Sequence, residues 1–105
     1  MSNNNRHDMI TLNRIAEECR KIALERKKIT VHSSHKGLCI GISAEWRELF
    51  EAGKHERSVH IPQYSAREEE AADVIIATLT YLESIGCKNI EQLIKDKVEY
   101  NRNRG

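Results

Sequence analysis

The chain has 105 residues, enough for one domain with little room for a second. Its 17 basic and 16 acidic residues give a net charge of +1, so no strong global field favours nucleic acid or an anionic membrane surface. Hydrophobic residues make up 39% and charged residues 31% of the sequence, which is typical of a folded helical protein rather than a disordered one. A monomer of this size can build only a modest core, which favours an oligomer.

The N-terminus and the cysteines indicate the compartment. The segment MSNNNRHDM is polar and lacks the apolar core of a signal peptide, and no apolar run is long enough to span a bilayer. Cys19, Cys39 and Cys87 are widely spaced and odd in number, a pattern that suggests neither a zinc site nor a disulfide framework. We therefore expect free thiols in a cytoplasmic protein, with residues 1–8 as a disordered tail and residues 9–105 as a single all-α domain.

The spacing of the apolar residues separates the first predicted helix from the connection that follows it. Apolar residues at three- and four-residue steps predict a helix over residues 9–29, with Thr11 or Asp8 as its N-cap. The segment TVHSSHKG then breaks the pattern. Ser33 or Ser34 is available there to cap the next helix.

The second predicted helix, HKGLCIGISAEWRELFEAGK, ends at Gly53 and carries an acid inside its apolar stripe. That stripe consists of Leu38, Ile42, Leu49 and Ala52, widened by Trp46 and Phe50. On a helical wheel Glu45 falls between Ile42 and Leu49. A carboxylate buried there would have to be paired, protonated or bound to a metal.

The second half of the chain contains a loop and a further pair of helices. The segment KHERSVHIPQY carries the only proline and has no helical period. Ser65 caps the third predicted helix and forms a capping box with Glu68. This helix runs to about Ile85 and ends at Gly86. After a turn, IEQLIKDKVEYNRNR forms a fourth helix whose predicted inner side is Ile90, Leu93, Ile94 and Val98. These elements predict a four-helix bundle.

The third helix combines an acidic edge with an otherwise apolar circumference. Glu70 and Asp73 lie three residues apart and line up with small polar residues further along the helix. The other sides are apolar, so the helix needs cover on more than one side, which argues for a partner subunit. Carboxylates from both helices would repel one another unless a hard divalent cation such as Mg²⁺ lay between them. Spacing alone is equally compatible with solvated acids, and Glu68 and Glu69 are more typical of helix N-terminal acids favoured by the macrodipole.

Several motifs of this sequence, and their order along the chain, resemble those of a known family. The sequence EWRE at residues 45–48, followed after 21 residues by EAAD at residues 70–73, resembles the E-x-x-E…E-x-x-D signature of the MazG-like all-α nucleoside triphosphate pyrophosphohydrolases. The segment EEEAADVIIATLTYLESIG is similar to that family's acidic helix, and KVEYNRNR to its C-terminal K-x-x-x-N-x-x-R. ERKKITVHSSHKGLCIGIS is similar to the entry into the second helix of the short, dCTP-hydrolysing branch. The resemblance covers about residues 10–104.

This resemblance implies an activity and an assembly. It implies hydrolysis of a nucleoside triphosphate, with the deoxy series favoured, to the monophosphate and pyrophosphate by a dimer or a dimer of dimers that completes the bundle. Glu45, Glu48, Glu70 and Asp73 would hold Mg²⁺, which would bridge the triphosphate oxygens and activate a water for attack on the α-phosphorus. Glu48 is the candidate to orient or deprotonate that water.

The resemblance also implies which residues contact the substrate. Lys97, Asn101 and Arg104 share one helical face; the two basic residues would counter phosphate charge, and the amide would bond phosphate or sugar. The alternative for these three is a solvated basic turn favoured by the helix dipole. His32 and Lys36 precede the second helix and are candidates for a contact with the base or a phosphate. The alternative is that both are ordinary surface residues.

Other functions remain open from sequence. A di-iron bundle would need E-x-x-H on its helices, and that spacing does not occur in this sequence. The remaining alternative is a non-catalytic helical module, either an interaction protein or a pseudoenzyme that binds nucleotide. The near-zero net charge argues against a nucleic-acid-binding role.

Overall fold

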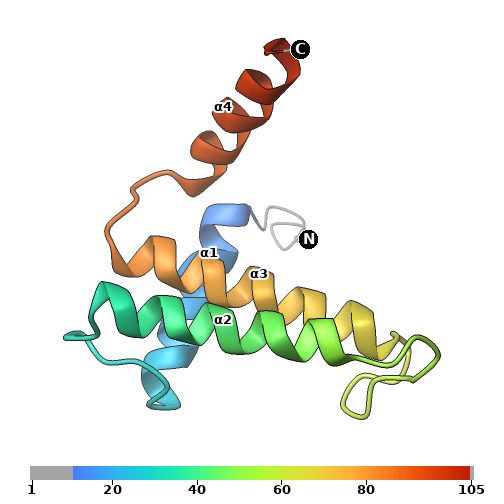
Figure 1. Ribbon diagram of the computed structural model, residues 1–105. Helices are drawn as coiled ribbons and strands as arrows, with labels where there is room; N and C mark the ends of the chain where they lie inside the picture. Colours follow the sequence, from blue (N-terminus) through green and yellow to red (C-terminus); the bar gives the residue numbers. More distant parts are fainter. Residues whose placement is uncertain (1–10, 105) are drawn as a thin grey trace, which may run out of the picture.

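The computed structural model describes residues 11–104 and confirms the all-α prediction. Its helices are α1 (Leu12–Glu25), α2 (His35–Glu51), α3 (Ala66–Ser84) and α4 (Ile90–Asn103) (Figure 1). The predicted tail, the Asp8 cap and the start of the first helix at Met9 lie outside the described residues. Within residues 11–104, none of the helices has the length and apolar character needed to cross a membrane.

Each helix begins at a polar side chain that accepts a bond from a backbone N–H in the first turn, which satisfies one of the free donors there. These N-caps are Thr11, Ser34, Ser65 and Asn89. The Ser65–Glu68 capping box forms as predicted: Ser65 Oγ accepts from the Glu68 N–H at 3.0 Å, and Glu68 Oε1 accepts from the Ser65 N–H at 2.8 Å. The start of α3, which carries the acidic edge, is therefore fixed from both sides.

The ends of the helices differ from the prediction in the first half of the chain. The predicted helix over residues 9–29 was too long, because α1 ends at Glu25 and Lys27 adopts a left-handed φ of 61°. The Lys28 N–H then bonds the Ala23 carbonyl at 2.9 Å, which folds the turn back over the helix end. The second helix ends at Glu51 with Ala52 in an extended conformation, ahead of the predicted stop. Gly86 follows α3 with a φ of 86°, the conformation expected of a glycine after a helix.

The third helix is the centre of the packing. α2 and α3 lie antiparallel and side by side, and α1 packs against α3 on another side (Figure 1). The core is a small cluster of Ala16, Leu79 and Ile90, with Leu82 and other half-buried residues around it. Hydrogen bonds tie the starts of α1 and α4 together: the Leu12 N–H donates to Glu91 Oε1 at 3.1 Å. α3 is thus covered by α1 and α2, but Ile75 and Ile76 on it remain 58% and 42% exposed.

α4 leaves the body of the molecule after its first residues (Figure 1). Ile90 is fully buried, whereas the other residues of its predicted inner side are 42–50% exposed: Leu93, Ile94 and Val98. One chain therefore does not close into a four-helix bundle. Trp46 and Phe50 were also expected to extend the apolar stripe of the second helix. They stack on each other with ring centroids 5.4 Å apart and are 55% and 74% exposed, so they widen the stripe of α2 without being covered by the described residues of their own chain.

A candidate metal centre between α2 and α3

Three carboxylates converge where α2 and α3 lie side by side. Glu45 comes from the middle of α2, and Glu70 and Asp73 come from the first turns of α3. One carboxylate oxygen from each lies within 4.8 Å of the others, and all three residues are half-buried. The antiparallel packing of the two helices produces this meeting, since it sets the middle of α2 opposite the start of α3. Carboxylate oxygens are the type of ligand that hard divalent cations prefer.

The electrostatics of the cluster are unfavourable without a cation. Burial raises the pKa of Glu45, and the negative charge of Glu48 adds to that effect. Burial likewise raises the pKa of Glu70, followed by repulsion from Glu48 and Asp73. Glu70 Oε1 is buried and accepts no hydrogen bond from any residue of the described chain. A buried oxygen without a donor is costly, so this atom is a natural ligand position.

A lysine that the sequence analysis did not single out partly compensates the cluster. Lys28 Nζ lies 3.9 Å from Glu45 Oε2. Burial raises the pKa of Asp73, and Lys28 opposes that rise. The sequence placed this residue in the basic run ERKKI and in the segment that resembles the family's entry into the second helix, but neither pattern assigned it a role. The left-handed Lys27 is what turns the chain back and brings Lys28 to the carboxylates.

The fourth predicted ligand, Glu48, lies beside the cluster rather than inside it. It is exposed on α2, one turn after Glu45. Its charge contributes to the raised pKa of each of the other acids, which places it close by. The structure thus brings three of the four predicted carboxylates together and leaves the fourth at their edge, facing solvent.

A groove of about 310 Å³ adjoins the carboxylates. Its apolar walls come from three helices and include Ile22, Ile42 and Ile76. Glu45 and Asp73 provide its acidic part, and Arg26 and Lys28 its basic part. The complete lining is Cys19, Ile22, Ala23, Arg26, Lys28, Ile29, Gly37, Leu38, Gly41, Ile42, Glu45, Asp73, Ile76, Ala77 and Thr80. Apolar walls with a few converging charged groups are typical of a small-molecule site.

The loop between α2 and α3 is tied to the acidic edge through a different carboxylate. Ser58 Oγ donates to Glu69 Oε1 at 2.6 Å, and His60 Nδ1 lies 2.9 Å from Glu69 Oε2. These bonds, the one from Ser58 first, lower the pKa of Glu69. Neighbouring acids on α3 therefore have opposite environments: Glu69 is satisfied by the loop, and Glu70 is not satisfied by any described residue.

The other predicted substrate residues are not at the cluster in this chain. Lys97 and Asn101 lie on α4, which extends away from the body, and Arg104 caps its C-terminal end (Figure 1). The ammonium of Lys97 lies 4.5 Å above the centre of the Tyr100 ring. His32 and Lys36 are exposed, in the turn before α2 and in its first turn, and neither lines the groove.

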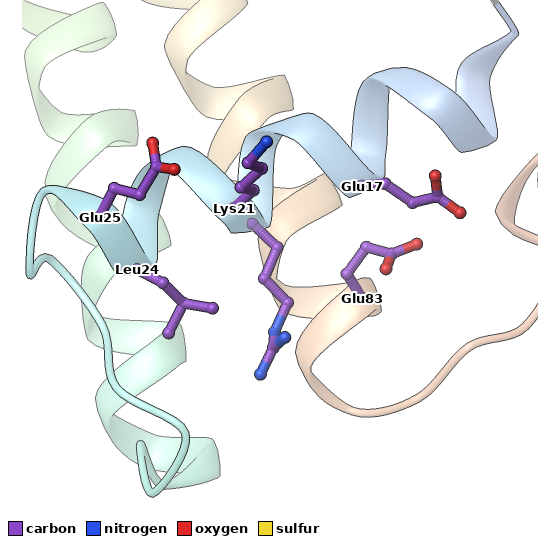
Figure 2. Close-up of a pocket in the computed structure, with 6 residues that line it drawn as sticks. Glu17, Lys21, Leu24, Glu25 and Glu83 are labelled. Atoms are coloured by element: carbon purple, nitrogen blue, oxygen red, sulfur yellow. The ribbon is translucent and has the colours of Figure 1, made fainter.

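A second depression, of about 340 Å³, lies on the surface formed by α1 and the end of α3 (Figure 2). Its lining consists of Glu17, Arg20, Lys21, Leu24, Glu25 and Glu83. Figure 2 shows acidic and basic side chains spread around it and pointing in different directions. Arg20 bonds Ser84 Oγ at 3.2 Å. The charged residues of this depression are of both signs and partly neutralise one another, so the acidic cluster remains the candidate site.

Comparisons of this chain with models of known protein families, with curated proteins and with solved structures gave no match.

The raised pKa values predict how stability depends on pH. A folded state that raises a carboxyl pKa binds the proton more tightly than the unfolded chain. The contribution to stability is therefore present below the unfolded pKa and is lost as the pH rises through the folded pKa. We expect Asp73→Asn to stabilise the metal-free protein at neutral pH by about 0.5–1 kcal/mol, seen as a Tm a few degrees higher, because it removes a repelled charge.

Thermal unfolding in a chelating buffer, measured at neutral pH and again near pH 4 (about the unperturbed carboxyl pKa), checks this. The difference between Asp73→Asn and wild type should shrink or reverse at the acidic pH. Asp96→Asn on exposed α4 is the matched control and should change Tm little. A destabilised Asp73→Asn at neutral pH would show that the carboxylate is already well compensated.

Proposed function

We propose that this protein is a Mg²⁺-dependent nucleoside triphosphate pyrophosphohydrolase of the MazG-like kind. The substrate is a nucleoside triphosphate, with the deoxy series favoured, and the products are the monophosphate and pyrophosphate. The observation that carries the proposal is the convergence of Glu45, Glu70 and Asp73 within 4.8 Å beside an apolar groove. The order of the E-x-x-E, E-x-x-D and K-x-x-x-N-x-x-R motifs supports the same reaction.

The donor set fits Mg²⁺ better than a softer metal. All of its members are carboxylates, which suit hard cations. A bound cation would also give the buried Glu70 Oε1, which has no hydrogen-bond partner among the described residues, an interaction partner. When bound, Mg²⁺ would neutralise triphosphate oxygens and lower the pKa of a coordinated water. Glu45, Glu70 and Asp73 would hold it there.

The remaining residues of the site have roles that follow from where they lie. Glu48 is exposed one turn from Glu45, and in this proposal its carboxylate would orient the attacking water and accept its proton. Once a divalent ion takes over Glu45, the Lys28 ammonium is free to bind a phosphate oxygen. The apolar walls beside Ile42 and Ile76 would receive the nucleoside and exclude water from it.

The proposal includes a second copy of the chain. Lys97, Asn101 and Arg104 would bind the phosphates, but they lie on and at the end of a helix that projects from its own body. That helix also carries Leu93, Ile94 and Val98 half-exposed. Docking of α4 onto a second chain would cover these residues and deliver the basic face to the partner's carboxylates. The projecting arm and the small core of one chain support a dimer or a dimer of dimers.

Release of pyrophosphate from a panel of ordinary and modified deoxynucleoside triphosphates, with and without Mg²⁺, tests the activity. We expect at least one triphosphate to be cleaved only with Mg²⁺. Asp73→Asn and Glu45→Gln should lower kcat/KM by about 100-fold or more, since each removes charge that holds the cation.

Glu51→Gln, at the end of α2 outside the cluster, is the matched control and should retain activity. Circular dichroism shows whether each variant is folded. A folded wild-type protein that leaves every triphosphate intact would contradict the proposed hydrolase. Binding of one triphosphate without cleavage would instead support the nucleotide-binding pseudoenzyme.

Mixing two inactive variants tests whether α4 acts on a second chain. Glu45→Gln lacks the acidic cluster, and Arg104→Ala lacks the basic contact. If each site combines carboxylates of one chain with α4 of the other, mixed dimers contain one intact site, and an equal mixture should recover about a quarter of wild-type activity. If α4 served its own chain, no mixed dimer would contain an intact site. Failure to recover activity from a mixture that size measurements show to have exchanged subunits would contradict the shared site.

A further inference from the structure

A cysteine, a histidine and a tyrosine form a connected set at the opposite end of α2 from Glu51. His35 and Cys39 lie four residues apart in the first turns of α2, so they share a face. Cys39 Sγ lies 3.6 Å from His35 Nε2, within hydrogen-bonding range for sulfur. Tyr81 Oη, from α3, lies 3.0 Å from His35 Nδ1. Both ring nitrogens of His35 therefore have a partner: the thiol of Cys39 at Nε2 and the hydroxyl of Tyr81 at Nδ1.

Tyr81 fixes the imidazole in both position and orientation. The two rings meet edge to face, with centroids 5.6 Å apart and an interplanar angle of 65°. A neutral imidazole has one donor and one acceptor nitrogen. When Nδ1 donates to the Tyr81 oxygen, Nε2 accepts the Cys39 S–H proton. After that proton has moved, both nitrogens are donors, and the same contacts hold an imidazolium beside a thiolate. A nucleophile, a base and a group that orients the base are the parts of an activated thiol.

The other thiols of the chain lie in a different environment. Cys19 and Cys87 pack against the core cluster of Ala16, Leu79 and Ile90. Burial raises the pKa of Cys19, and Glu18 raises it further, so this thiol resists ionisation. Among the described contacts, Cys39 is the cysteine with a side-chain base within hydrogen-bonding range. Cys39 is half-buried, as are Cys19 and Cys87, so the base beside it rather than its exposure sets it apart.

We propose that Cys39, with His35 as its base and Tyr81 as a positioning residue, is a nucleophilic thiol that small-molecule disulfides modify. The Cys39 proton passes to His35 Nε2, and the sulfur attacks one sulfur of the disulfide. A new S–S bond forms to Cys39, the original S–S bond breaks, and the second half leaves as a thiolate that takes up a proton from His35 or from solvent. The exchange needs no further oxidant, because the disulfide is itself the two-electron acceptor. The site does not depend on the proposed hydrolase.

The rate of reaction of the full chain with an aromatic disulfide at neutral pH tests this, with the labelled cysteine identified by peptide mass spectrometry. We expect Cys39 to be labelled before Cys19 and Cys87. His35→Gln should slow labelling about tenfold, because a free thiol is only a few per cent ionised at neutral pH and part of the gain is offset by lower nucleophilicity. Tyr81→Phe keeps the ring and should slow labelling roughly threefold.

The controls separate chemistry from folding. His55→Gln and Tyr100→Phe are the matched variants outside the set and should leave the rate unchanged. Helicity from circular dichroism shows that each variant is folded. The pH dependence of the labelling rate separates a chemical role of His35 from a structural one. In His35→Gln the labelling rate should depend on pH as it does in the urea-unfolded chain. Equal rates for wild type and His35→Gln, or labelling of another cysteine first, would overturn the proposal.

Discussion

The site depends on the packing of α2 against α3, which holds three carboxylates within 4.8 Å of one another. Folding keeps these groups together although burial and repulsion from neighbouring acids raise the pKa of each. The apolar contacts of α3 with its neighbours must outweigh that repulsion in the metal-free protein. A destabilised charge cluster kept by an otherwise consistent fold is expected at functional sites rather than at structural ones.

Several local features maintain this arrangement. The capping box fixes where α3 begins, and hence the register of Glu70 and Asp73 against α2. The bonds from Ser58 and His60 to Glu69 tie the connecting loop to the same helix end. The left-handed Lys27 turns the chain so that Lys28 reaches Glu45. Each of these features lies outside the carboxylate cluster, but together they determine its geometry and its residual charge.

The sequence predicted the parts of the fold that local chemistry determines. Ser65, and Ser34 as one of two candidates with Ser33, were predicted because a capping side chain leaves a local signature. The acidic edges of α2 and α3 were found because helical period places residues three apart on adjacent parts of one face. Their partners were harder to predict. The position of Lys28 depends on the left-handed conformation of Lys27, and no local sequence pattern indicated that a residue other than glycine would adopt it.

Periodicity also shows that a face is apolar without showing what covers it. Trp46 and Phe50 lie on the expected helix but are exposed, and the predicted inner side of α4 is half-exposed beyond Ile90. The direction of α4 is set by the short connection after Gly86 and by contacts of its first residues, neither of which has a period. The helix could therefore be predicted from sequence, but its departure from the body could not.

Calorimetric titration of the nucleotide-free protein with Mg²⁺ tests the central claim most directly, namely that the carboxylates of α2 and α3 act together as one cation site. Binding at mildly acidic pH should release protons, measurable from the dependence of the heat on buffer ionisation enthalpy, because the raised carboxyl pKa values leave protons to be displaced. Glu70→Gln should abolish both the binding and the proton release, and Glu51→Gln should preserve both. Mg²⁺ binding of equal strength in wild type and Glu70→Gln would contradict the account.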